Sequence, residues 1–309
     1  KNHHQKTVQF APESPVHFKP ELGVQFALEY PVWNNNLLEY VGKSERLYSD
    51  EIKEKQIRKY KNLIFIKYQN RLEISGSIHY YFNQGLHNAD DFYIEYCINA
   101  ILQIKRIFKL DLKKCFIVNL EYGVNINPIV NVSDLVHNLI YHEKRQFTRN
   151  TVHNDYKQAG VDAYKQVKAY NKSVQFPHEC KNTFRFEVRT QQAKFIHSLG
   201  IFTMQDLIAV DNYNILFNSL LKEWDSVLLF DLSKDIDLKF FNTYFWEDIL
   251  KNGSRNKFNN QKKLYYKKLG TNNLHSNIRK IIERKTKFLK CVHIPTITKV
   301  ETAQVKIKF

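Results

Sequence analysis

The chain has 309 residues, with 47 Lys and Arg against 31 Asp and Glu, and a formal net charge of +16. Such an excess attracts polyanions, although membrane surfaces and acidic proteins attract basic chains too. No apolar run approaches the roughly 20 residues that span a bilayer, so we expect no membrane partner. The four cysteines are far apart, which argues against a disulfide framework and favours a reducing cytoplasm.

The first 60 residues give few signals. Residues 23–30 alternate as a strand does and stop at Pro31, while residues 49–60 are charged and predict a helix or a solvated segment. We therefore treat residues 1–60 as a separate N-terminal segment of uncertain role.

From residue 61 onward the apolar patterns are clearer. They predict strands over 63–68, 72–82, 113–126, 164–172 and 183–189, with helices over 92–108, 133–140 and 191–199 and a polar loop over 145–160. These elements predict an α+β fold, an antiparallel sheet with helices on one face, and we assign residues 61–210 to one catalytic domain.

After residue 202 the pattern is mostly helical, with an apolar stripe over 215–230. Between Lys251 and Lys290 basic residues recur and the only acid is Glu283. We interpret 211–309 as a smaller helical basic region that binds duplex DNA or is accessory to the catalytic domain. The alternative is a solvated helical face.

Charged side chains share one face on three of the predicted strands. Arg185, Glu187 and Arg189 alternate with apolar residues, and Glu121 lies on the polar side of its strand. A glutamate held between two arginines is costly in a plain core, but it can place a metal-binding carboxylate beside a polyanion. Lys168, Arg185 and Arg189 are the predicted DNA contacts.

Glu121 and Glu187 are the predicted ligands of Mg²⁺ or Mn²⁺, because carboxylate oxygens suit these hard cations. His79, on the strand over 72–82, could complete the shell, and so could Glu73. Each of these residues has a simpler alternative role. Glu121 would be a surface glutamate, Glu187 would form an ion pair with its arginines, and His79 would be an ordinary hydrogen-bonded histidine.

A tyrosine can attack a phosphodiester and form a covalent phosphotyrosyl link. Tyr156, Tyr164 and Tyr170 are the candidates, since each lies in or just before the strand over 164–172. Lys172 on that strand would contact phosphate or steady the leaving oxygen. Packing or base stacking is the alternative role of each tyrosine.

Several of these segments together resemble a known family. The segments are 168–172 (Lys-Ala-Tyr-Asn-Lys), 184–189 (Phe-Arg-Phe-Glu-Val-Arg), 193–207, 119–125, and 75–79 followed by 83–85. They are similar to motifs of the rolling-circle replication initiators, and more narrowly of the replication-initiation-factor family of plasmids, filamentous phages and conjugative elements. The resemblance covers roughly residues 63–207.

The resemblance implies an enzyme that nicks and rejoins DNA at a replication origin, assisted by a divalent metal. A tyrosine would stay joined to the 5′ phosphate and leave a free 3′ hydroxyl. In the family this tyrosine lies about a dozen residues before the Tyr-(Asp/Asn)-Lys motif, in a Tyr-x-Gly-Ser segment. Tyr156 stands at about that distance from Tyr170, without the Gly-Ser.

The expected partners are single-stranded DNA or an origin duplex and a host helicase and polymerase, and a homodimer is an open alternative to a single copy. The chain contains no P-loop sequence, so we expect no nucleotide-driven unwinding by the chain itself. Two alternatives stay open: a non-catalytic single-stranded nucleic-acid-binding protein, and a metal-dependent phosphodiesterase that uses water.

Overall fold

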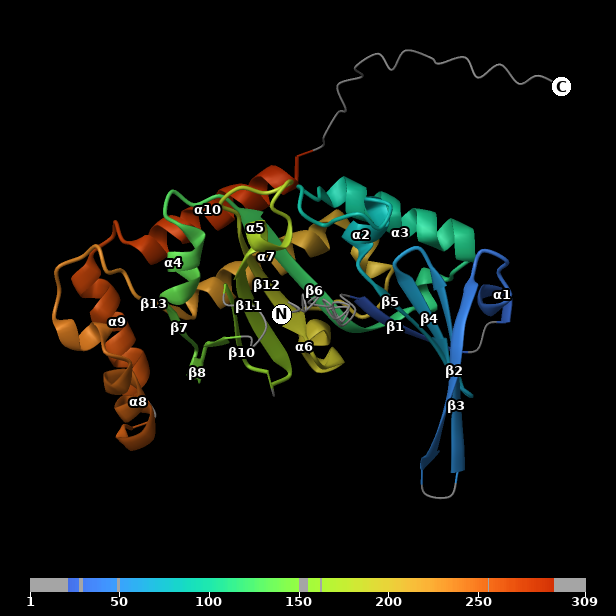
Figure 1. Ribbon diagram of the computed structural model, residues 1–309, viewed down its shortest axis with the longest axis horizontal. Coiled ribbons are helices and arrows are strands. Elements are labelled where there is room, and N and C mark those ends of the chain that lie inside the picture. Colours follow the sequence, from blue (N-terminus) through green and yellow to red (C-terminus); the bar gives the residue numbers. More distant parts are fainter. Residues whose placement is uncertain are drawn as a thin grey trace, which may run out of the picture.

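A long antiparallel sheet organises the chain. In the computed structural model, which describes residues 22–27, 30–48, 51–149, 155–161, 163–254 and 256–291, ten strands run in the order β2-β3-β4-β5-β1-β6-β12-β11-β10-β9. A second sheet has the order β13-β7-β8. Figure 1 shows the β2–β3 hairpin projecting at one end of the molecule and helices α8 and α9 lying at the other.

The strands of the long sheet are β1 Leu22–Ala27, β2 Glu39–Tyr48, β3 Glu51–Tyr60, β4 Leu63–Lys67, β5 Arg71–Gly76, β6 Phe116–Ile126, β9 Thr148–Arg149, β10 Tyr156–Ala159, β11 Lys165–Asn171 and β12 Phe184–Thr190. The short sheet contains β7 Leu139–His142, β8 Arg145–Gln146 and β13 Val227–Leu229. The α-helices are α1 Tyr30–Trp33, α2 Ile78–Phe82, α3 Ile94–Phe108, α4 Val132–His137, α5 Lys172–Gln175, α6 Ala193–Ser198, α7 Val210–Asp225, α8 Thr243–Asn252, α9 Lys257–Leu269 and α10 Leu274–Leu289. The predicted α+β class is confirmed.

Two apolar cores lie against the sheet. One packs α3 on β4 and β5, and the other packs α7 and α10 on β6, β11 and β12. The second core contains, among others, Val124, Val167, Phe186, Trp224 and Ile282. Because apolar and polar residues alternate along β12 and along β11 from Gln166 onward, this packing leaves Lys168, Arg185, Glu187 and Arg189 on the opposite face.

A register shift in β6 keeps its apolar residues on one side. Gly23 of β1 pairs with Asn119, but Val24 pairs with Ile117, so Val118 is an extra residue. The shift brings Ile117 and Leu120 into the same core despite their odd spacing. Glu121 is thereby kept on the polar side.

Helices α8 and α9 build a third core with the short sheet. It is rich in aromatic residues: Tyr141, Phe230, Phe240, Trp246, Phe258 and Tyr265. Helix α10, by contrast, shares the core of the long sheet through Ile278 and Ile282. The division at residues 60 and 210 stays a prediction, and β1 to β3 and α10 contact the middle of the chain directly.

Several predicted elements were wrong. Residues 51–60 form the strand β3 rather than a helix, and β2 was not predicted at all. The predicted strand over 72–82 ends at Gly76, and α2 follows. The predicted loop over 145–160 contains the short strands β8, β9 and β10. The helix predicted to run to residue 230 ends at Asp225 and is followed by β13.

Within the described part of the chain, none of the helices combines the length and the apolar character needed to cross a membrane.

Candidate functional site

The strands β6, β12, β11 and β10 align most of the predicted site residues on one sheet face. In the register, Lys168 pairs with Glu187 and Glu187 with Gly123. A neighbouring row runs from Tyr156 through Tyr170 and Arg185 to Asn125, and a third joins Gln166, Arg189 and Glu121. We call the side chains of Glu121, Asn125, Tyr156, Lys168, Tyr170, Arg185, Glu187 and Arg189 the polar face. Directly opposed residues of adjacent strands have neighbouring side chains, so these groups interact.

Glu187 is the buried centre of the polar face, with 1 % of its surface exposed. Its carboxylate forms an ion pair with Arg185 and lies 3.3 Å from the Lys168 Nζ. Burial raises the pKa of Glu187, but Arg185 and Lys168 lower it by more, so its pKa lies well below the ordinary value. Glu187 is therefore a carboxylate at any physiological pH.

Lys168 links the two predicted metal ligands. Its Nζ lies 2.5 Å from Glu121 Oε2 as well as 3.3 Å from Glu187 Oε1. Burial lowers the pKa of Lys168, but the two glutamates raise it further, so the ammonium keeps its charge. The ammonium group of Lys168 thus bridges the carboxylates of Glu121 and Glu187.

Gly123 lets β6 approach Glu187 closely. A Cβ atom at this position would lie 2.4 Å from the Glu187 Cβ and 2.4 Å from the Phe186 carbonyl oxygen. Only glycine fits at this separation, because real Cβ atoms do not come so close to other heavy atoms. The space beside the Glu187 side chain therefore depends on Gly123, which has no side chain.

Tyr156 and Tyr170 stack on the polar face. Their ring centroids are 5.2 Å apart, and Tyr170 Oη lies 3.4 Å from Glu187 Oε2. Burial raises the pKa of Tyr156, and the nearby Lys168 ammonium lowers it only in part. Tyr170 is buried, whereas Tyr156 is partly exposed and is the more accessible of the two phenols.

Tyr164 and Lys172 do not lie on the strand as predicted. Tyr164 precedes β11 in a turn, is 45 % exposed, and contacts the ring of Phe195. Lys172 is the first residue of α5 and is fully buried, with its Nζ 2.6 Å from Asn88 Oδ1 and 2.8 Å from Gln175 Oε1. A phosphate cannot reach Lys172 without opening this packing, so its position suits holding α5 in place.

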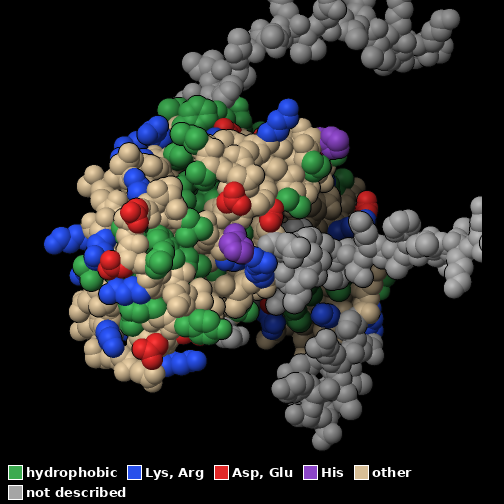
Figure 2. All heavy atoms as spheres, turned by 60° about the vertical axis from the view of Figure 1, so that its left-hand side comes forward, with side chains coloured by type: hydrophobic (Ala, Val, Ile, Leu, Met, Phe, Trp, Pro, Cys, Tyr) green, Lys and Arg blue, Asp and Glu red, His purple; other side chains and the backbone are tan. Residues whose placement is uncertain are grey.

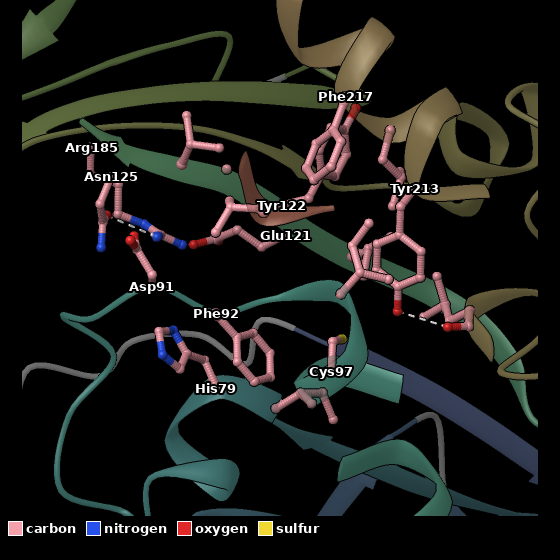
Figure 3. Close-up of a pocket in the computed structure, with 18 of the residues that line it drawn as sticks. His79, Asp91, Phe92, Cys97, Glu121, Tyr122, Asn125, Arg185, Tyr213 and Phe217 are labelled. Atoms are coloured by element: carbon pink, nitrogen blue, oxygen red, sulfur yellow. Dashed lines mark hydrogen bonds between the residues drawn. The ribbon is translucent and has the colours of Figure 1, made fainter. Parts of the chain in front are cut away.

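His79 was predicted on a strand but lies in α2, because Ser77 caps a helix there. Its Nε2 is 2.7 Å from Asp90 Oδ1, and its ring stacks on Phe92 with the centroids 4.3 Å apart and the planes at 6°. His79 therefore does not lie on the sheet, but it lines the same cavity as three residues of the polar face. Figure 3 shows His79 and Phe92 on one wall of this cavity, with Glu121, Asn125 and Arg185 on another.

Arg185 and Arg189 extend the positive charge of the polar face. Arg185 is buried and donates from Nη1 to Asn125 Oδ1 at 3.1 Å. Arg189 lies opposite Glu121 and is partly exposed, and its buried Nε makes no hydrogen bond. Of the two arginines, Arg189 is the better placed for an incoming phosphate.

The carboxylates of the polar face suit a hard divalent cation. Glu121 and Glu187 offer oxygen ligands, as Mg²⁺ and Mn²⁺ prefer, but the Lys168 ammonium already lies between them, so a metal ion would bind here in its place. Across the described residues, His79 does not join these two glutamates in a group of three possible ligands.

A second cluster of possible metal ligands was not predicted. The ligand atoms of His142, Glu143 and Glu223 lie within 4.8 Å of one another on the opposite side of the sheet. The Lys165 Nζ lies 2.7 Å from Glu223 Oε1 and 3.0 Å from Glu143 Oε1, so an ammonium group already neutralises the cluster. His142 ends β7, Glu143 follows in the turn before β8, and Glu223 lies in α7, so no sequence pattern brings Glu223 to the other two.

Sequence reasoning left Asn125 out of the predicted site residues and missed Asp90 and Asp91 as neighbours of the site. Asn125 donates to the Ala89 carbonyl, and Asp91 pairs with Lys285 of α10 at 2.7 Å. The polar alternation of β6 could have indicated Asn125, which follows Glu121 at an even spacing. The two aspartates lie in a loop, where only the fold decides their place.

Basic side chains also occur on the helical end of the molecule. Figure 2 brings this end forward and shows Lys and Arg side chains spread between hydrophobic and acidic ones, not gathered in one patch. On α9, Lys263 and Lys267 are exposed, whereas Lys268 pairs with Asp237 at 3.2 Å.

Comparisons with known proteins give limited information. No protein-family model matches the chain, and no curated protein matches it either. Among solved structures, the rolling circle replication initiator protein from Geobacillus stearothermophilus is similar over 75 % of this chain and 94 % of that chain, with 14 % sequence identity and a TM-score of 0.43. A likeness this distant leaves the function to be argued from the site.

Proposed function

We propose that the chain nicks and rejoins DNA at a replication origin of the rolling-circle kind, with Tyr156 as the nucleophile. The observation that supports this most is the place of Tyr156. It is a partly exposed phenol on the same sheet face as Glu121, Glu187, Lys168 and Arg189, among which a scissile phosphate would lie. The motif resemblance of 168–172 and 184–189 points in the same direction.

In the proposed reaction the Tyr156 phenol oxygen attacks the phosphorus of one DNA strand. The bond from phosphorus to the 3′ oxygen breaks, the 3′ oxygen takes up a proton, and the 5′ phosphate stays joined to Tyr156. Rejoining is the reverse: a 3′ hydroxyl attacks the phosphotyrosyl link and frees the phenol. Because burial raises the pKa of Tyr156, the phenol is protonated before attack, and its proton must leave during the step.

The cations and carboxylates of the polar face have separate roles in this proposal. Arg189 and Lys168 hold the phosphate and stabilise the negative charge of the transition state. Glu121 and Glu187 would hold Mg²⁺ or Mn²⁺, and the metal would supply polarisation of the phosphate. Tyr170 supports the Tyr156 ring by stacking, and Arg185 keeps the Glu187 carboxylate charged and oriented.

We propose further that the protein works in the cytoplasm beside a host helicase and polymerase. Its DNA substrate is single-stranded DNA or an origin duplex. The exposed lysines of α9 would contribute phosphate contacts away from the polar face.

The test is incubation with labelled single-stranded DNA from the protein's own replicon and Mn²⁺, followed by a denaturing gel. We expect a covalent protein–DNA band that needs metal and is lost in Tyr156→Phe. Tyr164→Phe is the matched control, because it removes a phenol that lies off the polar face, and it should keep the band. Cleavage without a covalent band would instead indicate a phosphodiesterase that uses water, and binding without cleavage would indicate a plain binding protein.

A further inference from the structure

A cavity of about 150 Å³ lies beside the polar face, along one edge of β6. Within the described residues, β1 pairs with β6 as far as Leu120, while β12 pairs with the other edge of β6 from Glu121 onward. The edge from Glu121 to Asn125 therefore faces the space between α2 and α3 on one side and α7 and α10 on the other (Figure 3).

The cavity has a polar end and an apolar end. Glu121, Asn125 and Arg185 belong both to the polar face and to the polar end of the cavity. Side chains of α3 and α7 line the apolar end, among them Cys97, Tyr213 and Phe217. A ligand that fills both ends must combine a hydrophobic body with a polar edge.

Two aromatic rings that stack on each other form one wall of the cavity. The rings of His79 and Phe92 are nearly parallel, at 6°, with centroids 4.3 Å apart. A volume of about 150 Å³ exceeds the roughly 30 Å³ share of a single water several times, yet it is smaller than the roughly 300–1,000 Å³ of sites for drug-sized molecules. Shape and size therefore suit one planar ring system.

The polar end is rich in hydrogen-bond acceptors. Asp90, Asp91 and Glu121 contribute carboxylates to the lining, and Arg185 is the cation among them. Asp91 is also held by Lys285, and Asp90 by His79 and Asn83, so these carboxylates have fixed positions. A carboxylate oxygen accepts more than one hydrogen bond, so these groups can accept one from an amino group in addition to their present partners, which for Glu121 include Lys168.

We infer that this cavity takes a nucleobase that carries an exocyclic amino group, turned out of the DNA strand next to the phosphate bound on the polar face. That a DNA strand is bound rests on the proposed function. That one of its bases enters the cavity rests on the shape and lining of the cavity. Guanine, cytosine and adenine present an amino group to the carboxylates, whereas thymine does not. The cavity would thus select the base beside the nick.

Nucleosides test the cavity without involving phosphate contacts or cleavage. We would measure the binding of deoxyguanosine, deoxycytidine, deoxyadenosine and thymidine to the full chain by saturation-transfer NMR. At least one amino-bearing nucleoside should bind on the order of tenfold more tightly than thymidine, the size expected when a hydrogen-bonded base edge is lost. Equal binding of all four nucleosides, or no binding, would overturn the inference.

A pair of variants assigns the binding to the cavity. Phe92→Ala removes one of the two stacked rings of the aromatic wall and should weaken nucleoside binding. Phe202→Ala is the matched control, because Phe202 also lies against a histidine, His197 at 5.0 Å, but is 49 % exposed outside the cavity. If thermal unfolding shows that Phe92→Ala does not fold, Cys97→Phe, which fills the cavity with a ring, replaces it. Binding unchanged by the folded cavity variant contradicts the inference.

The two proposals fail separately. Selective nucleoside binding in a protein that forms no covalent adduct would keep the base cavity and remove the nicking function. A covalent adduct in a protein that binds no nucleoside would keep the nicking function and remove the base cavity.

Discussion

Glu187 illustrates how a single carboxylate can be essential to the folded state and to the site at once. It is buried, and its charge is stabilised by Arg185 and Lys168. Removing one partner of such a pair leaves a buried charge without compensation, which costs roughly 3–5 kcal/mol. Glu187→Gln should therefore lower the free energy of unfolding at neutral pH by about that amount, as measured by urea denaturation.

The pH dependence of the same variant has a definite sign. The folded-state pKa of Glu187 is lowered, so its stabilising contribution is complete above the unfolded-state pKa of about 4.3 and is lost as the pH falls toward the folded-state pKa. Urea denaturation repeated at decreasing pH should show the wild type losing stability faster than Glu187→Gln below about pH 4.3. A stability difference that stays constant down to acidic pH would contradict the pairing.

The close approach of β6 and β12 at Gly123 can be tested by substitution. In Gly123→Ala the new methyl group would lie 2.4 Å from the Glu187 Cβ, so β6 and β12 must move apart. We expect a loss of roughly 1–3 kcal/mol in the free energy of unfolding, as for overpacked cores. Gly42→Ala is the control, because a Cβ at Gly42 meets nothing within 4 Å, and it should unfold like the wild type. Equal stability of the two variants would refute the close approach.

Between elements, a buried ion pair joins β11 to α7. Lys165 and Glu223 are each about 8 % exposed in their side chains, and the Lys165 Nζ is 2.7 and 2.8 Å from the two Glu223 oxygens. Lys165→Met alone leaves Glu223 charged and buried, so it should destabilise the fold by roughly 3–5 kcal/mol. Lys165→Met combined with Glu223→Met removes both charges and should recover a large part of that loss.

A double-mutant cycle by thermal or urea unfolding measures the coupling of this pair. Simple additivity of the two single substitutions would mean that the contact does not hold β11 to α7. Lys168→Met with Glu121→Met gives a second cycle on the polar face, which should also couple because Lys168 Nζ lies 2.5 Å from Glu121.

The elements that could be predicted from the sequence are those with a strong period. Strand β12 alternates throughout, β6 does so after its register shift and β11 from Gln166 onward, and α3 carries a helical stripe, so their places were predicted to within a few residues. Strands β2 and β3 form a charged hairpin, and at the positions whose side chains are described, 39–43 and 54–60, none is buried, which is why β3 was predicted as a helix or a solvated segment. After Gly76, the capping by Ser77 outweighs the continued alternation and starts α2.

The sequence predicts which face of the sheet carries the site residues, but it does not predict which of them contact each other. Alternation places Glu187 between Arg185 and Arg189, yet only the register shows that Lys168 lies opposite Glu187 and Tyr156 opposite Tyr170. Residues near element ends were placed least well: Lys172 turns inward because Asn171 caps α5. Lys165 and Glu223 are 58 residues apart, and only the packing of α7 on the sheet brings them together.

Over the whole molecule, the net charge of +16 makes DNA affinity depend on salt. For single strands the logarithm of the binding constant should fall with the logarithm of salt concentration by about 0.7 per phosphate contacted. If α9 contacts the strand, Lys263→Gln with Lys267→Gln should reduce this slope by about 1 to 1.5, since each lysine contributes one phosphate contact. Fluorescence anisotropy over a salt series measures it.

The matched control is Lys105→Gln with Lys109→Gln, which lowers the net charge equally. These two residues are exposed at the C-terminal end of α3, at the opposite end of the molecule from α9 (Figure 1). If only total charge mattered, both double variants would change the slope alike. If α9 lies on the path of the DNA strand, only the α9 variant changes it, because counterion release counts local contacts and long-range attraction is screened beyond about 10 Å at 0.1 M salt.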